Sequence, residues 1–444
     1  MDAASSPPSP VIPDPAGIRR SFRLGVWNGA LYMMGEGFVD ASAVVPVFLA
    51  RLGASGALIG FGSSLSDLGW FLPQVAVVPI SAHRPLQMPL YRAAAVFRSG
   101  SLALMALALL LLHGHPAAIL AAFLLLYGTF CFGAGFAGIA FMEIVGKTVP
   151  AEQGGRLFAQ RVLWGGALVA VAGIVVRELL RGAPGPEAFA PIFGCAAVFT
   201  AISFVVFGRI REPAVAQPAP ARTFGSIARE AVASVRREPV YGKLLLSRAA
   251  LALWTSCAPF VVLLAARDLG GGPRAAGTFL LSRMAGQVLS NLGWQSLAKR
   301  SGTPAVMRGA TLLAGTGAAL AAVVAALSPI GAGWLGATAS VNLLVGLAAL
   351  GGAAQSGTVM SYSSLMLELA PEGDRPMFVG LLNTVLALTM LLPPLAGALV
   401  DRIGAPWVFA LYALLAVPCH LAARGLPQPG SGRGALARRS AAGA

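Results

Sequence analysis

Long apolar segments alternate with short polar connections along this chain. A helix needs about 20 largely apolar residues to cross the hydrocarbon core of a bilayer, and twelve stretches reach that length. They cover approximately 24–49, 54–81, 91–112, 117–146, 157–180, 188–208, 241–266, 273–298, 305–328, 333–367, 376–400 and 405–423. The pattern therefore predicts an all-α integral membrane protein with twelve transmembrane helices.

One connection, 209–240, is much longer than the others and separates the sixth apolar segment from the seventh. It contains an amphipathic stretch from Phe224 to Arg237, which is typical of a helix that lies at the membrane surface. We expect this linker to join two six-helix halves. The expected boundaries are a disordered tail at 1–20, an N-terminal half at 21–210, a linker at 211–240, a C-terminal half at 241–424 and a disordered tail at 425–444.

The two halves repeat each other in sequence. Three pairs of positions are 217 residues apart, namely Gly53 and Gly270, Gly60 and Gly277, and Gln74 and Asn291. A second motif begins at Pro150 after the fourth segment and recurs at Pro371 after the tenth. Apolar halves related by a parallel repeat are typical of a large group of membrane transporters. The repeat therefore favours a transporter over a static membrane anchor.

Composition agrees with a membrane protein. Hydrophobic residues make up 57% of the chain and charged residues 11%, whereas soluble domains carry about 25% charged residues. The net charge of +15 comes from arginines and lysines in the short loops, so it orients the protein in a membrane and does not indicate nucleic-acid binding. If both termini are cytoplasmic, only six basic residues lie in outer loops: Arg51, Arg177, Arg181, Arg267, Arg274 and Arg402. We therefore expect a multi-pass protein of a bacterial inner membrane with both termini inside.

The sequence gives no support for a cofactor. The four cysteines lie singly in apolar segments, and His113 and His115 lack a third ligand for a metal. No Gly-rich phosphate-binding loop is present, which argues against ATP-driven transport by this chain alone. We expect no enzyme activity, no cofactor and no metal. The expected partners are a small-molecule substrate and the bilayer, for a protein that works as a monomer.

Several charged residues lie near the middle of apolar segments, where an ionisable side chain is costly and usually functional. Glu36 and Asp40 are four residues apart, so they share one face of the first helix. Asp67 lies in the second segment. The eighth segment carries a stripe of polar residues at every fourth position, formed by Arg283, Gln287, Asn291 and Gln295. We expect the acids of the N-terminal half to face Arg248 and Arg283 of the C-terminal half across a water-filled cavity.

A purely structural role is the alternative for these charges. Glu36 or Asp67 can instead pair with Arg98, Arg248 or Arg283 and hold helices together. Arg98 lies about two turns inside the third segment, from where its side chain can also reach back to the interface. Arg283 is the strongest candidate for contacting substrate, and it favours an anionic or zwitterionic group. Proton coupling through the acids is a weaker expectation, because structural ion pairs occupy similar positions.

Twelve segments in two repeated halves, with a long middle linker, resemble the major facilitator superfamily over about residues 20–424. The most specific motifs run from Met366 to Arg375 and from Gly397 to Gly404. The loop residues that match or replace the family's cytoplasmic motifs are Arg84, Glu143, Arg156, Lys299, Arg300, Glu368 and Arg375. The family's acidic latch motif is altered in both halves, because Lys299 stands where it has an aspartate and the loop at Arg84 has no acid.

The resemblance implies a secondary transporter of a small organic solute that works by alternating access, with a proton as the expected coupling ion. Two alternatives remain. The first is a transporter-like protein that acts as a membrane sensor or scaffold, which the altered latch motifs favour. The second is a polytopic membrane enzyme, which would need a carboxylate cluster at a loop that this sequence lacks.

Overall fold

In the computed structural model, the described part of the chain is helical and contains no strand. The structure describes residues 15–81, 85–182, 185–214, 239–369 and 388–427, apart from the side chains at 74–81, 151 and 367–369. The N-terminal helices are α1 (Pro15–Phe38), α2 (Val44–Arg51), α3 (Gly56–Ser81), α4 (Met88–Leu111), α5 (Pro116–Thr148), α6 (Ala151–Leu179), η1 (Pro186–Phe189) and α7 (Ala190–Phe207). The C-terminal helices are α9 (Pro239–Leu263), η2 (Leu264–Asp268), α10 (Ala275–Ser301), α11 (Thr303–Leu327), α12 (Ala337–Leu369), η3 (Leu388–Leu391), α14 (Leu392–Ile403) and α15 (Ala405–Arg424).

The first predicted helix is broken, so the prediction of one continuous segment at 24–49 was wrong. α1 ends at Phe38 and α2 begins at Val44. Asp40 lies in the break, where its carboxylate oxygen Oδ1 accepts hydrogen bonds from the backbone N–H groups of Ser42 (3.0 Å) and Ala43 (2.9 Å). A short acidic side chain that binds the backbone in this way competes with helical hydrogen bonding. Asp40 therefore stabilises the turn between α1 and α2 and does not continue α1.

Two of the other predicted boundaries can be compared with the described residues. α1 begins at Pro15, so the prediction of disorder was wrong for residues 15–20. α9 begins at Pro239, two residues before the expected start of the C-terminal half. The amphipathic stretch from Phe224 to Arg237 lies outside the described residues.

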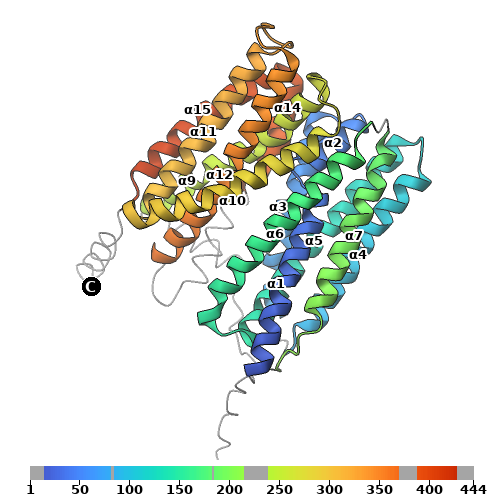
Figure 1. Cartoon of the computed structure of the whole chain (residues 1–444), viewed down its shortest axis with the longest axis vertical. Coiled ribbons are helices and arrows are strands. Elements are labelled where there is room, and N and C mark those ends of the chain that lie inside the picture. Colours follow the sequence, from blue (N-terminus) through green and yellow to red (C-terminus); the bar gives the residue numbers. More distant parts are fainter. Residues whose placement is uncertain (1–14, 82–84, 183–184, 215–238, 370–387, 428–444) are drawn as a thin grey trace, which may run out of the picture.

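The helices form two groups with equivalent packing. In the N-terminal half α1 packs against α6 and α7, while α5 packs against α3 and α4. In the C-terminal half α11 packs against α12 and α15, while α10 packs against α12. Figure 1 shows the blue-to-green and yellow-to-red helices as two bundles. This arrangement confirms the predicted fold of two repeated halves.

The repeated glycines occupy equivalent positions in the two halves. Gly53 and Gly270 both adopt a positive φ, of 74° and 72°, in the turns that precede α3 and α10. Gly60 of α3 lies so close to Pro393 of α14 that a Cβ atom there would be 2.0 Å from the Pro393 oxygen. Gly277 of α10 lies equally close to α6, with its Cβ position 2.4 Å from the Gly173 oxygen. Small residues at these crossings let helices of opposite halves come into backbone contact.

These contacts between the halves lie at one end of the molecule. We call the end that holds Pro15 and Arg424 the terminus side and the opposite end the far side. Gly60 and Gly277 lie near the ends of α3 and α10 on the far side, and Gly56 donates a hydrogen bond from its backbone N–H to Oδ2 of Asp401 there (2.7 Å). Figure 1 shows the two bundles together at the upper right and separating toward the terminus side.

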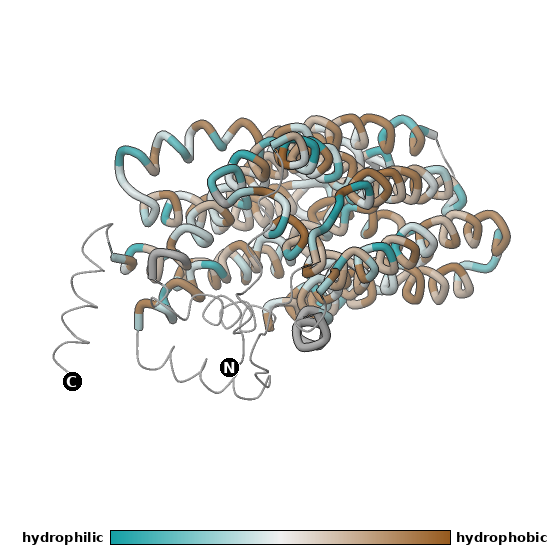
Figure 2. The backbone as a smooth tube through the Cα atoms, turned by 90° about the horizontal axis from the view of Figure 1, so that it is seen from below, coloured by the Kyte–Doolittle hydropathy of each residue, from teal (hydrophilic) through white to brown (hydrophobic). Residues whose placement is uncertain are grey.

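Eight of the helices in the described residues are long and apolar enough to cross a membrane: α4, α5, α6, α7, α9, α11, α12 and α15. Polar residues lower the hydropathy of α1 and α10, while α3 and α14 adjoin residues outside the described part. Figure 2 shows hydrophobic segments on most of the outer helices and hydrophilic segments at helix ends and in the middle of the molecule. The two helices that are too polar for the hydropathy criterion, α1 and α10, both line the interface between the halves.

Candidate functional site

A cavity of about 310 Å³ lies between the two halves, and its lining comes from both. α1 and the turn after it contribute Glu36 and Asp40, and α3 contributes Asp67. Arg283 and Gln287 of α10 line the opposite wall. The structure thus brings together five of the seven residues that the sequence predicted for a central cavity. Thr255 and Gln355 also line it and were not predicted.

Asp40 and Arg283 form an ion pair that joins the halves. Oδ2 of Asp40 accepts a hydrogen bond from Nη2 of Arg283, and the two side chains are only 14% and 17% exposed. Nη1 of Arg283 also donates to Oε1 of Gln355 on α12, at 3.3 Å. The second oxygen of Asp40 is held by the backbone of the following turn. The pair therefore links the break in the first helix to α10 and α12 of the other half.

Glu36 has a different partner, which lies in its own half. Nη2 of Arg98 donates to Oε1 of Glu36, and Nη1 donates to the hydroxyl oxygen of Tyr32 at 3.0 Å. The Arg98 side chain is only 1% exposed, and its guanidinium stacks on the ring of Phe130 at 4.3 Å. Of the two alternatives for Arg98, the structure shows the pairing with Glu36, and the side chain does not reach back to the interface. A carboxylate and an aromatic face compensate its burial inside the N-terminal bundle.

Asp67 has no comparable partner. The structure gives its carboxylate no hydrogen bond or ion pair with any described residue, and its side chain is exposed to the cavity. Arg248 of α9 does not line this cavity; its guanidinium lies over the ring of Tyr362, 5.9 Å from the centroid. Of the two arginines predicted to face the N-terminal acids, Arg283 lines the cavity and forms an ion pair, whereas Arg248 interacts with Asp67 only electrostatically, without an ion pair.

The polar stripe of α10 divides into two parts. Arg283 and Gln287 face the cavity. One turn further along, Asn291 accepts a hydrogen bond from the Ser356 hydroxyl of α12, and the cavity lining does not include it. Trp294 likewise donates from Nε1 to the backbone oxygen of Ala353, at 2.9 Å. The terminus-side part of the stripe holds α10 against α12.

Comparison with known proteins gives a partial family match and a shared fold. A family model described as "Major Facilitator Superfamily" matches residues 244–442, which lie almost entirely in the C-terminal half and its tail. Solved structures that share the fold are described as a nucleoside transporter and a peptide transporter. The chain therefore has the fold of these transporters, and its C-terminal half resembles the major facilitator superfamily.

Solved structures match the fold of this chain over nearly its whole length. A mutant form of the nucleoside transporter NupG is 17% identical with a TM-score of 0.68, covering 92% of this chain and 99% of its own. A POT family transporter in complex with 5-aminolevulinic acid is 12% identical with a TM-score of 0.66, covering 93% and 96%. A bacterial homologue of the iron transporter ferroportin, in an inward-facing state, is 15% identical with a TM-score of 0.62, covering 91% and 98%. No curated protein matches the sequence.

The predicted loop motifs of the superfamily are only partly described. Arg84, Arg375 and the side chain of Glu368 lie outside the described residues. Arg156 lies over the ring of Phe22, 5.8 Å from the centroid. Lys299 and Arg300 are exposed at the end of α10, and Glu143 forms no ion pair within the described part of the chain. The described residues therefore do not show Glu143 paired with a loop arginine.

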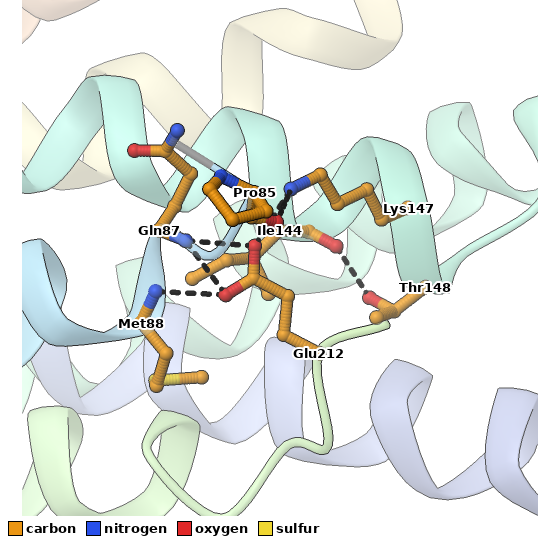
Figure 3. A network of polar contacts seen from close by, with 7 residues as sticks. All are labelled: Pro85, Gln87, Met88, Ile144, Lys147, Thr148 and Glu212. Carbon is orange, nitrogen blue, oxygen red and sulfur yellow. Dashed lines mark hydrogen bonds and ion pairs between the residues drawn. The ribbon is translucent and has the colours of Figure 1, made fainter. Parts of the chain in front are cut away.

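Sequence reasoning missed a buried charge cluster on the terminus side of the N-terminal half. The Glu212 side chain is 2% exposed and accepts hydrogen bonds from Lys147 Nζ and from the backbone N–H groups of Gln87 and Met88, each at 2.8 Å at the closest (Figure 3). The carboxylate thus caps the N-terminus of α4 and ties it to the end of α5. Lys147, one of the chain's three lysines, and the Arg-Glu-Pro sequence at the start of the linker were the available signals. This cluster holds one half together and does not touch the other.

Proposed function

We propose that the chain is a proton-coupled secondary transporter of a small zwitterionic solute, and that this structure is its inward-facing conformation. The halves meet on the far side and separate toward the terminus side. If the terminus side is cytoplasmic, as the distribution of basic residues predicts, the central cavity faces the cytoplasm. The observation that carries the proposal is one carboxylate without an ion-pair partner among the described residues, beside an ion pair that joins the halves.

The charges of the cavity favour a zwitterion over a simple anion. Arg98 compensates Glu36 and Arg283 compensates Asp40, so Asp67 is the carboxylate of the described lining without an ion-pair partner, and Arg248 acts on it only electrostatically. A cationic amine would compensate Asp67. A carboxylate on the same solute would compete with Asp40 for Arg283, whose guanidinium can bind carboxylates through two hydrogen bonds. A volume of about 310 Å³ suits a small solute.

The same charges offer a place for the coupling proton. When a substrate carboxylate takes Arg283, the ion pair between Asp40 and Arg283 opens. Asp67 lies in the same cavity without a cation bonded to it and can take up a proton when no amine is present. Because the ion pair joins the halves, its opening links substrate binding to movement of one half against the other.

Binding can be tested before the substrate is identified. The purified chain is screened by thermal shift against amino acids and dipeptides. For each compound that binds, the measurement is repeated with its N-acetyl derivative and with its amide. We expect both derivatives to bind at least about tenfold more weakly, since each loses one charged contact. An N-acetyl derivative that binds as well as its parent would overturn the assignment of an amine to Asp67.

Transport is then measured in proteoliposomes with a labelled compound from that screen. We expect an inward-directed pH gradient to drive uptake by wild-type protein. The Asn291→Ala variant is the matched control, because Asn291 lies on α10 outside the cavity lining. A ligand that binds but is not taken up under any gradient would favour the membrane-sensor alternative.

A further inference from the structure

A second cavity, of about 500 Å³, lies at the far-side junction of the halves, and we call it the junction pocket. The end of α6 contributes Arg177, Glu178 and Arg181, while the start of α10 contributes Arg274. It adjoins the crossing of α6 and α10, where a Cβ on Gly277 would lie 2.5 Å from the Arg177 nitrogen. The pocket is therefore formed by both halves and exists in this form only while they are in contact.

Positive charge dominates its lining. Glu178 is shared between Arg177, at 2.9 Å, and Arg181, at 3.5 Å. Arg274 is exposed and forms no ion pair or side-chain hydrogen bond with a described residue. The nearby Asp268 is already paired with Arg267, at 2.7 Å. Closing the far side thus brings arginines of opposite halves into one pocket with a single acid to compensate them.

The remaining lining supplies neutral hydrogen-bonding groups. Thr278 lies one turn into α10, and Thr338 and Asn342 lie in the first two turns of α12. The starts of both helices therefore border the pocket, and the positive end of a helix dipole adds to the attraction for an anion. Guanidinium groups bind phosphate oxygens in pairs, which suits a phosphate group better than a halide ion.

We propose that the junction pocket binds a phosphate group, which bridges Arg177 and Arg181 of one half to Arg274 of the other and holds the far side closed. The group is carried either by a soluble phosphate or by the headgroup of an anionic lipid, because the pocket lies at the helix ends. The proposal stands on the far-side contacts and does not depend on the substrate of the central cavity.

The test measures the distance between the halves on the far side. The four cysteines are replaced, and spin labels are attached through His115→Cys and Ile330→Cys, which place them in exposed far-side loops of opposite halves. One arm titrates inorganic phosphate against chloride at equal ionic strength in phosphatidylcholine nanodiscs. The other arm replaces phosphatidylcholine by phosphatidylglycerol without added phosphate. We expect a larger population of short distances in at least one arm, and the responding arm identifies the source.

Substitutions separate a built site from a general salt effect. Arg274→Gln and Arg177→Gln should each raise the concentration for half of the response at least about tenfold, since each removes a charged hydrogen-bond donor. Arg402→Gln is the matched control, because Arg402 is an exposed far-side arginine outside the lining. Its response should equal that of the wild type. No response in either arm, or the same response in Arg274→Gln and Arg402→Gln, overturns the proposal.

Discussion

Glu36 at the end of α1 and Asp40 in the turn after it line the same cavity but belong to different ion pairs. Glu36 binds Arg98 within the N-terminal half, whereas Asp40 binds Arg283 across the interface between the halves. Movement of the halves as rigid bodies leaves the first pair intact and must separate the second. The comparison shows that the position of a partner, and not the acid itself, decides whether a membrane charge stabilises a bundle or takes part in a conformational change.

The largest effect is expected for the pair inside the half. Arg98→Met removes the buried cation with its hydrogen bonds to Glu36 and Tyr32. Breaking a fully buried pair costs about 3–5 kcal/mol, and the loss here should lie near the lower end because Glu36 is 32% exposed to the cavity. We expect a large fall in unfolding free energy, measured by denaturant or thermal unfolding in detergent. Adding Glu36→Gln to Arg98→Met should recover part of the loss. Equal stability of Arg98→Met and wild type would contradict a buried structural pair.

For the ion pair across the interface we expect a small effect on stability and a large effect on transport. Arg283→Gln keeps hydrogen-bonding capacity at a site that is partly open to the cavity, so we expect a small change in Tm. Uptake in proteoliposomes should fall at least about tenfold because the carboxylate of the solute loses its cation. If Arg283→Gln destabilised the protein as much as Arg98→Met, the distinction between the two pairs would fail.

Asp67 extends the comparison to an acid that forms no ion pair with a described residue. Asp67→Asn removes a titratable group and leaves the volume of the cavity nearly unchanged. We expect uptake that no longer responds to the pH gradient, measured at equal membrane potential, while exchange of internal for external solute continues. Retention of the full pH response would place the coupling proton elsewhere.

The smallest effect is expected at Asn291, which shares a helix stripe with Arg283 but bonds within its own half. Asn291→Ala removes one hydrogen bond, which contributes about 1 kcal/mol to stability. Uptake should remain within about twofold of wild type. A tenfold loss of uptake with unchanged stability would extend the functional site toward the terminus side.

The sequence predicted the architecture well because hydropathy and the internal repeat report on it directly. The glycines 217 residues apart do occupy equivalent helix crossings. The sequence also predicted that five residues lie near one another, because charged residues in apolar segments face an internal cavity or a partner. These residues are Glu36, Asp40, Asp67, Arg283 and Gln287.

What the sequence could not give was the choice of partner. Glu36 and Asp40 are equivalent on a continuous helix, and only the break at Asp40 turns one acid toward Arg283 and leaves the other with Arg98. Helix periodicity does not register a side chain that bonds to its own backbone. The contact of Glu212 with Lys147 is also remote in sequence, so no local pattern reports it.

The separation of Asp40 from Arg283 during transport can be tested by cross-linking two residues that lie beside this ion pair. Ser42 and Ala258 belong to opposite halves and line one small pocket beside Arg283. In a variant without the native cysteines, Ser42→Cys and Ala258→Cys are linked by a short, cleavable thiol cross-linker, and uptake is measured before linking, after linking and after cleavage. The account predicts that linking abolishes uptake and that cleavage restores it. Undiminished uptake by fully linked protein would contradict it.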